Sequence, residues 1–279
     1  GEVTRDFFAR HSDIRAVIHF AALKAVGESV SKPLEYYFNN LNSLMNVLTC
    51  MREFKVPNLV FSSSCTVYGQ ADVLPVTEKT PRHEAESPYG NTKVMSEDII
   101  RDLMRVEPDM KALALRYFNP IGAHPTAFIG ELPNGVPNNL IPYLTQTAIG
   151  IREQLSVFGD DYNTPDGSPL RDYIDVVDLA QAHVVAIRRL LDGKNKKNYE
   201  FFNIGTGKAL SVLEIIHAFE RATGVKVNYK VVGRRAGDIE KVWADTTLAN
   251  NELGWKAVTP IEETLANAWK WQKSLEATN

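Results

Sequence analysis

Two short segments bring together side chains that could exchange a proton with an alcohol. The apolar run 58–61 is followed directly by serines that end at Ser64. Further along, Tyr89 and Lys93 lie four residues apart, which places both on one face of a helix. An ammonium group beside a tyrosine favours the phenolate and lowers its pKa from about 10. Tyr89 is therefore a candidate general base that shares the proton of a bound hydroxyl with Ser64.

The Tyr89 and Lys93 pair is a weak signal by itself. This spacing arises by chance about once in a chain of this composition, and a pair on a helix surface is the alternative interpretation. Ser64 follows a strand-like run roughly 25 residues earlier, and Pro88 suits the first turn of a helix. This context favours the catalytic interpretation.

The elements around these residues predict an α/β fold with a doubly wound, parallel, Rossmann-like sheet. Short apolar runs at 16–21, 58–61 and 112–118 alternate with helical patterns that begin near Pro33 and Tyr89. Continuous apolar strands that alternate with helices are typical of parallel sheets covered on both faces. The carboxyl ends of such strands share one edge of the sheet. We therefore expect the residues that follow them, Phe20, Ser64 and Asn119, to meet in one crevice.

The character of the chain changes near residue 120, where loops rich in Pro, Gly and Asn begin. We expect a sheet domain over 1–120 and, over 121–279, a smaller α/β lobe with some return to the main sheet. The strands expected in the second region are 155–158, 201–204 and 227–232, and the helices are 178–191, 212–223 and 262–272.

Composition excludes several classes of protein. The chain has 279 residues, 44% hydrophobic and 23% charged, with a net charge of −3, so it lacks the basic excess of a nucleic-acid surface. Two cysteines and scattered histidines give no metal-binding spacing and favour a reduced, cytoplasmic protein. We see no signal peptide and no run long and apolar enough to span a membrane.

Further motifs follow one another along nearly the whole chain. They are 19–29, the Ser64 segment, the Tyr89 and Lys93 pair, 115–120, 137–140, 171–174 and 234–238. In this order they resemble the UDP-galactose 4-epimerase (UDP-glucose 4-epimerase) family of the extended short-chain dehydrogenase/reductases. The resemblance implies an isomerase that interconverts UDP-galactose and UDP-glucose with NAD. Tyr89 would take the proton of the sugar C4 hydroxyl as hydride passes to NAD, and hydride would return to the other face of the 4-keto sugar.

The resemblance also assigns residues to each ligand, with no metal. Lys93 would tune Tyr89 and hold the nicotinamide ribose, while Ser64 would bond the reacting oxygen. The positions that match cofactor contacts are Phe20, Ala21, Ala22, Leu23, Lys24, Asn39, Ser64, Tyr89, Lys93 and Phe118. Those that match UDP-sugar contacts are Lys24, Ser64, Thr66, Tyr89, Asn119, Asn139, Leu140, Ile141, Phe158, Arg171, Arg235 and Asp238. By this resemblance 1–120 is part of an NAD-binding domain, and 121–279 mainly binds the UDP-sugar.

Two of these residues, Arg171 and Arg235, suit a diphosphate because a guanidinium binds its oxygens in pairs. Each has an alternative interpretation as an ion pair. Arg171 could bind Asp172 or Asp175, and Arg235 could bind Asp238.

Single positions sharpen the resemblance. The related 4,6-dehydratases carry an Asp-Glu pair beside their Thr, whereas Ser64-Cys65-Thr66 holds no carboxylate, so water elimination is disfavoured. Cys65 replaces the usual alanine and is expected to pack inertly, although a thiol at this position could sensitise the site to oxidation. Val242 stands where some members carry a pocket-narrowing Tyr and others a small residue. It therefore predicts some activity on N-acetylated UDP-hexosamines.

The start of the sequence keeps other functions open. The family opens with a strand and a Gly-x-x-Gly-x-x-Gly turn, about 60 residues that would precede Gly1. One alternative is therefore a non-catalytic or impaired fragment that binds UDP-sugar or dimerises. Another is a 4-epimerase of uronic acids or pentoses. The resemblance further implies a homodimer through the helices near 34–53 and 89–105.

Overall fold

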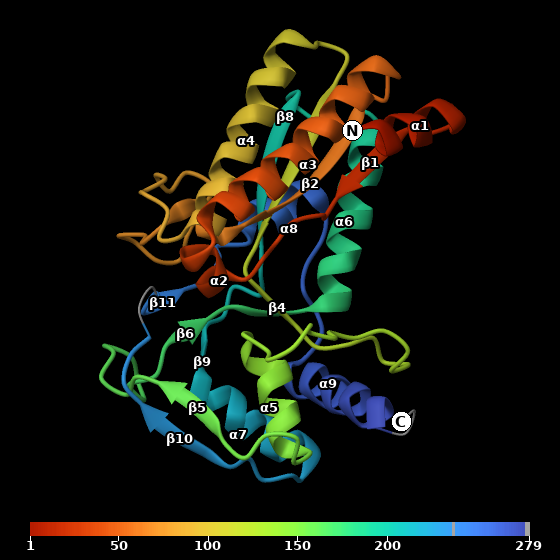
Figure 1. The fold of residues 1–279 in the computed structure, drawn as a ribbon. Helices are drawn as coiled ribbons and strands as arrows, with labels where there is room; N and C mark the ends of the chain where they lie inside the picture. Colours follow the sequence, from red (N-terminus) through yellow and green to blue (C-terminus); the bar gives the residue numbers. More distant parts are fainter. Residues whose placement is uncertain (236–237, 277–279) are drawn as a thin grey trace.

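The centre of the computed structural model, which describes residues 1–235 and 238–276, is a parallel sheet (Figure 1). Its strand order is β1-β2-β3-β8, with every neighbouring pair parallel. The four strands are β1 (Ala16–His19), β2 (Asn58–Ser64), β3 (Lys111–Tyr117) and β8 (Tyr199–Ile204). The last strand comes from the second half of the chain, so the sheet joins both halves.

Helices cover both faces of the sheet, which confirms the doubly wound α/β fold. Successive strand residues point to opposite faces. On β2, Leu59 and Phe61 belong to the core beneath α3 (Pro33–Glu53) and α4 (Pro88–Val106). Val60 faces the opposite core, which lies under α6 (Val176–Leu191) and α8 (Thr247–Leu253). The near-continuous apolar character of the strands follows from this two-sided burial.

A second group of elements lies below the sheet in Figure 1. Here β5 (Leu155–Phe158) pairs with β10 (Tyr229–Val232), and a third core holds the helices together. The helices are α5 (Leu140–Ala148), α7 (Val212–Thr223) and α9 (Ile261–Glu276). Short strands connect the two groups: β4 (Asn119–Ile121) with β7 (Tyr173–Asp175), and β6 (Leu170–Arg171) with β9 (Leu210–Ser211) and β11 (Lys241–Val242).

The structure departs from the sequence expectations at several places. It contains helices that we did not predict, namely α1 (Glu2–Arg10), α2 (Val26–Ser31), α5 and α8. None of these four has a side-chain hydrogen bond that caps its first turn, so the usual start signal is absent. The first strand ends at His19 instead of residue 21, because its last pair with β2 is His19 with Phe61.

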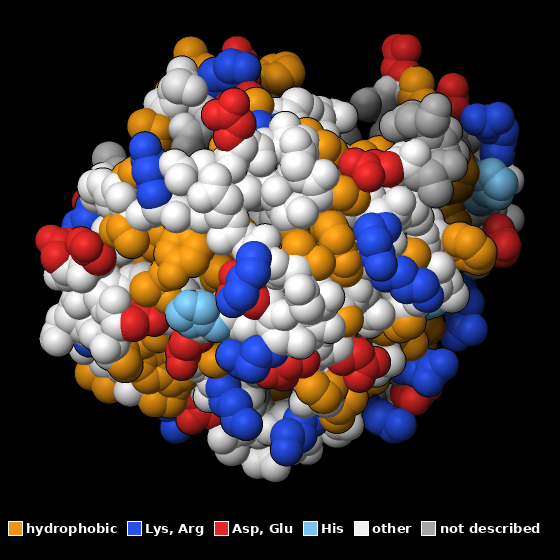
Figure 2. All heavy atoms as spheres, turned by 90° about the horizontal axis from the view of Figure 1, so that it is seen from below, with side chains coloured by type: hydrophobic (Ala, Val, Ile, Leu, Met, Phe, Trp, Pro, Cys, Tyr) orange, Lys and Arg blue, Asp and Glu red, His pale blue; other side chains and the backbone are white. Residues whose placement is uncertain are grey.

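The surface is mixed in charge. On the face shown in Figure 2, acidic and basic side chains alternate among small apolar patches and do not gather by sign. Among residues 1–235 and 238–276, no helix combines the length and apolar character needed to cross a bilayer. The same residues contain no group of His, Cys, Asp or Glu side chains suited to a metal ion.

Candidate active site

The carboxyl ends of three adjacent strands bring Ser64, a predicted catalytic residue, to the same edge of the sheet as the predicted cofactor residues Phe20 and Phe118. Phe20 follows β1, Ser64 ends β2 opposite Tyr117, and Phe118 follows β3. Phe118 is buried, whereas Phe20 is 56% exposed at this edge. Nucleotides bind at such edges in open α/β sheets, so exposed apolar surface here suits a flat ring.

Ser64 is fixed by the turn that follows it. Its hydroxyl accepts a hydrogen bond from the backbone N–H of Thr66 at 3.2 Å and caps the 3-10 helix η1 (Cys65–Tyr68). The turn closes at Gly69, whose φ is +60° and whose added Cβ would lie 2.4 Å from the Glu84 carbonyl oxygen. Thr66 Oγ1 is buried without a hydrogen-bond partner in the described chain. A ligand hydroxyl beside Ser64 would satisfy it.

Tyr89 lies in the first turn of α4, which begins as the sequence predicted. Pro88 occupies the first helical position, and the Ser87 hydroxyl accepts from the N–H of Gly90 at 3.1 Å. The ring of Tyr89 is buried. Burial raises the pKa of Tyr89 well above its ordinary value, and a hydrogen bond with Ser64 only partly opposes this rise. Our expectation of a lowered pKa is therefore wrong for the protein without ligands.

Lys93 lies one turn further along α4 and is also buried. Its Nζ donates to the Ser62 carbonyl oxygen at 2.7 Å and lies 5.8 Å from the centre of the Tyr89 ring. Burial lowers the pKa of Lys93 to about 8, against an opposing effect of Glu97. An ammonium has three N–H donors, and Ser62 is its one hydrogen-bond partner in the part of the chain described. Two donors remain for ligand hydroxyls.

The segment after β1 is held by a residue that the sequence did not single out. The Asn40 side chain accepts from Leu23 N–H at 2.8 Å and donates to the Leu23 carbonyl and to Thr92 Oγ1, both at 3.1 Å. The predicted contact residue, Asn39, is exposed and donates to Asn40 Oδ1. No local sequence signal identifies Asn40, because its burial depends on the distant segment at Leu23.

Arg171 lies at the end of β6 and does not pair with either neighbouring acid. Its Nη1 donates to the carbonyl oxygens of Leu170 and Glu240. The Asp172 carboxylate instead accepts from the Thr206 backbone and hydroxyl. Asp175 caps α6. The ion-pair alternative for Arg171 is therefore wrong.

Arg235 does form its alternative ion pair. Its Nη2 and Nε donate to the two oxygens of Asp238 at 2.8 and 3.2 Å, and its Cζ lies 5.2 Å from the centre of the Phe158 ring. The structure thus brings together three of the predicted sugar-nucleotide residues. Ala236 and Gly237 of this motif lie outside the described residues.

A carboxylate joins two further predicted residues. Glu131 Oε1 accepts from Lys24 Nζ at 3.0 Å and from Asn139 Nδ2 at 2.8 Å. Asn139 directly precedes α5, in whose first turn Leu140 and Ile141 lie. Lys24 and Asn139 are both exposed, so a ligand can reach them.

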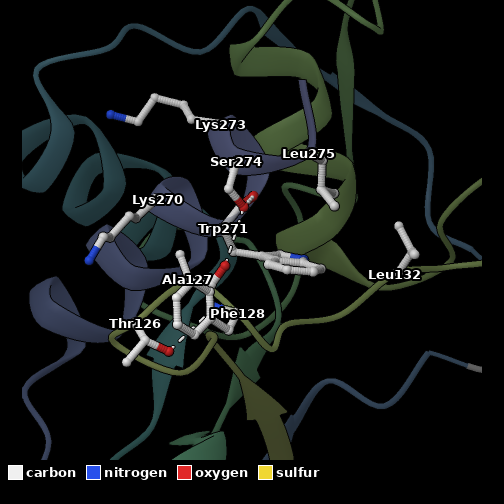
Figure 3. Close-up of a pocket in the computed structure, with 9 residues that line it drawn as sticks. All are labelled: Thr126, Ala127, Phe128, Leu132, Lys270, Trp271, Lys273, Ser274 and Leu275. Carbon is white, nitrogen blue, oxygen red and sulfur yellow. Dashed lines mark hydrogen bonds between the residues drawn. The ribbon is translucent and has the colours of Figure 1, made fainter. Parts of the chain in front are cut away.

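A hollow of about 900 Å³ lies elsewhere on the molecule. It is lined by the loop at Thr126–Phe128, by Leu132 and by the end of α9. Figure 3 shows Lys270 and Lys273 directed away from the aromatic rings of Phe128 and Trp271. No predicted catalytic, cofactor or sugar residue lines this hollow, which holds no paired acid and base, so we do not assign the chemistry to it.

Similarity to known proteins agrees with this geometry. The sequence profile of the family described as GDP-mannose 4,6 dehydratase matches residues 4–268. The UDP-glucose 4-epimerase of Mus musculus is 51% identical over 266 residues, which are 95% of this chain and 76% of the mouse protein. The chain belongs to the UDP-glucose 4-epimerase family. The Bacillus subtilis member is 50% identical over 273 residues, which are 98% of this chain and 79% of that protein.

Solved structures of the family have the same fold. The UDP-glucose 4-epimerase of Stenotrophomonas maltophila, with bound NAD and formylated UDP-arabinopyranose, superposes with a TM-score of 0.95 at 46% identity, covering 100% of this chain and 81% of that one. The Bifidobacterium longum enzyme, in complex with NAD+ and UDP, gives a TM-score of 0.92 at 46% identity, covering 98% and 80%. The shared fold extends through both groups of elements.

Proposed function

We propose that the protein is an NAD-dependent isomerase that interconverts UDP-galactose and UDP-glucose. One observation carries this conclusion: in a member of the 4-epimerase family, buried Tyr89, Lys93 and Ser64 converge at the carboxyl edge of the sheet. No carboxylate stands beside Thr66 in the sequence, which disfavours the elimination of water by a dehydratase.

The residues at this edge fit a dinucleotide. Lys93 retains two N–H donors for the hydroxyls of a ribose, and Phe20 and Leu23 offer exposed apolar surface for a ring. We assign the remaining cofactor contacts to residues on the segment after β1, on α3 and after β3. They are Ala21, Ala22, Lys24, Asn39 and Phe118. Bound NAD supplies a hydride acceptor and donor for the sugar carbon.

The chain's own residues move the proton. Tyr89 accepts the proton of the C4 hydroxyl, and Ser64 bonds the same oxygen. Tyr89 in the protein without ligands favours its neutral form because it is buried. A positive charge bound beside it would lower that pKa, so proton transfer is coupled to the state of the cofactor. Lys93, fixed by the Ser62 carbonyl, holds its ammonium near the phenol.

We assign the UDP-sugar to the region where the carboxyl edge of the sheet meets the lower elements. Arg171 carries a charge without a carboxylate partner among the described residues, and Arg235 can exchange Asp238 for a phosphate. Residues 1–120 then form part of the cofactor domain, and 121–279 mainly the sugar-nucleotide lobe. The other assigned contacts are Lys24, Thr66, Asn119, Asn139, Leu140, Ile141 and Phe158.

The test is a substrate panel with added NAD. We expect conversion of UDP-galactose to UDP-glucose, which proton NMR can monitor through the anomeric signals. Turnover of UDP-glucuronic acid or a UDP-pentose at a higher kcat/KM than UDP-galactose would favour a different 4-epimerase. Binding of UDP without conversion of any sugar would favour the non-catalytic alternative.

We also propose that UDP-N-acetylglucosamine and UDP-N-acetylgalactosamine are substrates. Val242 packs with Val67, Tyr68 and Phe118 and pairs in register with Arg171, so a residue smaller than tyrosine adjoins the assigned sugar site. The Val242→Tyr variant should turn over the N-acetyl sugars more slowly and should retain its turnover of UDP-galactose. Good turnover of UDP-galactose together with none of the N-acetyl sugars would contradict this proposal.

Finally, we propose a homodimer in the cytoplasm. Large apolar side chains are exposed on the two helices that the family resemblance assigns to the interface, Leu34, Phe38 and Met45 on α3 and Met95 on α4. Both cysteines are free thiols, as expected in a reducing compartment. Light scattering of the protein as it elutes from a size-exclusion column should give twice the mass of the chain. The Phe38→Glu variant should give the mass of one chain.

A further inference from the structure

A buried carboxylate lies on the catalytic helix directly after Lys93. Glu97 follows Lys93 by one turn of α4, and its side chain is 0% exposed. Tyr89, Lys93 and Glu97 recur every four residues, so they lie along one side of the helix. The proposed chemistry uses the first two of these side chains and does not use the third.

Glu97 joins the catalytic helix to two strands of the sheet. On β3, Arg116 donates from Nε to Oε1 at 2.9 Å and from Nη2 to Oε2 at 2.5 Å. On β2, the hydroxyl of Ser63 donates to Oε1 at 2.5 Å. Arg82 also donates to the Oε2 atom of Glu97. Ser63 is the immediate neighbour of Ser64, so this carboxylate bonds within one residue of the catalytic hydroxyl.

The cluster keeps Glu97 ionised in spite of its burial. Burial raises the pKa of Glu97, but the hydrogen bonds and charges of Arg116 and Arg82 outweigh it and lower that pKa. A fixed negative charge therefore stands beside the ammonium of Lys93, which has no carboxylate in hydrogen-bond contact among the residues described.

We propose that Glu97 is a positioning residue of the epimerase site, whose carboxylate keeps Lys93 in its ammonium form and ties the strand that carries Ser64 to the helix that carries Tyr89. This inference rests on the proposed function for its catalytic meaning. The effect of the Glu97 charge on the protonation of Lys93 involves only groups within the chain, so it can be tested without substrate.

Other groups around Lys93 set the background for this effect. On β1, burial and, to a smaller extent, the positive charge of Lys93 lower the pKa of His19 to about 4, so this imidazole is neutral at pH 7. Tyr89 is neutral because it is buried. Ser62, whose carbonyl holds Lys93, bonds His183 of α6, and burial also lowers the pKa of His183. Glu97 is thus the charged group that favours the ammonium, while the guanidiniums of Arg116 and Arg82 bound to its oxygens offset part of its negative charge.

The first test measures the titration of Lys93 by NMR of lysine labelled with carbon-13 at Cε, assigned with Lys93→Met. Glu97→Gln keeps the shape and removes the charge. We expect the pKa of Lys93 to fall by about one unit. Glu200→Gln is the matched control, because Glu200 also pairs with a buried arginine, Arg189, at 2.8 Å and lies on β8. An unchanged titration in both variants would overturn the proposal.

The second test uses Ser63→Ala, which retains the three charges of Glu97, Arg116 and Arg82 and removes the link to β2. We expect kcat to fall about five-fold, with KM for UDP-galactose and the Lys93 titration unchanged. Ser96→Ala, which changes another buried serine of α4, should leave kcat within about two-fold. An unchanged kcat in Ser63→Ala would overturn the positioning role. Lack of activity in the unmodified protein would instead refute the proposed function, while the NMR titration still decides the effect of Glu97 on Lys93.

Discussion

The proton-transfer cluster and the proposed sugar-nucleotide contacts are built in opposite ways. Tyr89, Lys93 and Ser64 are 7%, 5% and 6% exposed. The side chains of Lys24 and Arg235 are 68% and 51% exposed, and each is bound to a carboxylate of the chain itself. The first set is fixed before any ligand arrives, whereas the second is held by partners that a ligand can replace.

The difference follows from the energetics of each task. A buried cluster excludes water and keeps reacting groups in fixed geometry, which is what proton transfer requires. Exposed ion pairs contribute only about 0–1 kcal/mol, so exchanging Glu131 or Asp238 for a diphosphate costs little. On the proposed assignments, the molecule combines a preformed reaction site with a binding surface whose ion pairs a ligand can exchange.

The largest effect should come from the preformed set. Tyr89→Phe removes one oxygen from a buried ring and should lower kcat by about 10³-fold, because a general base contributes roughly 10²–10⁴. KM for UDP-galactose should change little. Tyr229→Phe on β10 is the control and should retain full activity. A Tyr89→Phe variant with more than a tenth of the original kcat would refute the assignment.

The second-largest effect should come from Arg171, whose positive charge we assign to the binding of the diphosphate. Arg171→Ala removes a guanidinium without breaking an ion pair within the described chain, so the loss should appear in binding. We expect the Kd for UDP to rise about 10–100-fold, as for loss of a hydrogen bond to a charged group. Arg152→Ala, which removes an arginine stacked on Tyr143, is the control. Equal calorimetric affinities in both variants would contradict the diphosphate assignment.

A smaller effect, of opposite sign, should follow the release of an exchangeable pair. Glu131→Gln weakens the contact that occupies Lys24 and Asn139, so KM for UDP-galactose should fall about two- to five-fold. Glu53→Gln alters another exposed ion pair, with Arg5, and should leave KM unchanged. A rise in KM for Glu131→Gln would show that Glu131 supports the bound state instead.

The smallest effect concerns the thiol beside the reaction site. Burial raises the pKa of Cys65 to about 12, so the thiolate is scarce at about pH 7–8. Iodoacetamide at about pH 7.5 should leave activity unchanged, with mass spectrometry showing an unmodified Cys65 peptide. Rapid inactivation with Cys65 alkylated would contradict this, and would support the expectation that the thiol sensitises the site to oxidation.

Local sequence signals predicted much of this molecule. The apolar runs predicted the three strands β1, β2 and β3, and Pro88 marked the start of α4. Tyr89 and Lys93 could be identified because the signals that mark them are local in the sequence. These signals are their spacing, the residues that cap the helix and the strand that precedes it.

The remaining features depend on contacts between distant segments. Asn40 and Glu97 lie in helices where polar residues usually face solvent, and only packing against Leu23 and Arg116 reveals their burial. The pKa of Tyr89 was misjudged for the same reason, since burial by distant elements outweighs its neighbour on the helix. Short helices such as α2 and α8 lack side-chain caps and gave no start signal.

The pairing of β8 with β3 has a consequence for the order of folding. Ala112 pairs with Tyr199, so every element from β4 to α6 is synthesised before β8 can join the sheet. Contacts between such distant residues form slowly, and an open strand edge with a bare apolar face invites aggregation. While the chain is still on the ribosome, β3 therefore has an exposed edge, and we expect chaperones to bind the nascent chain until β8 emerges.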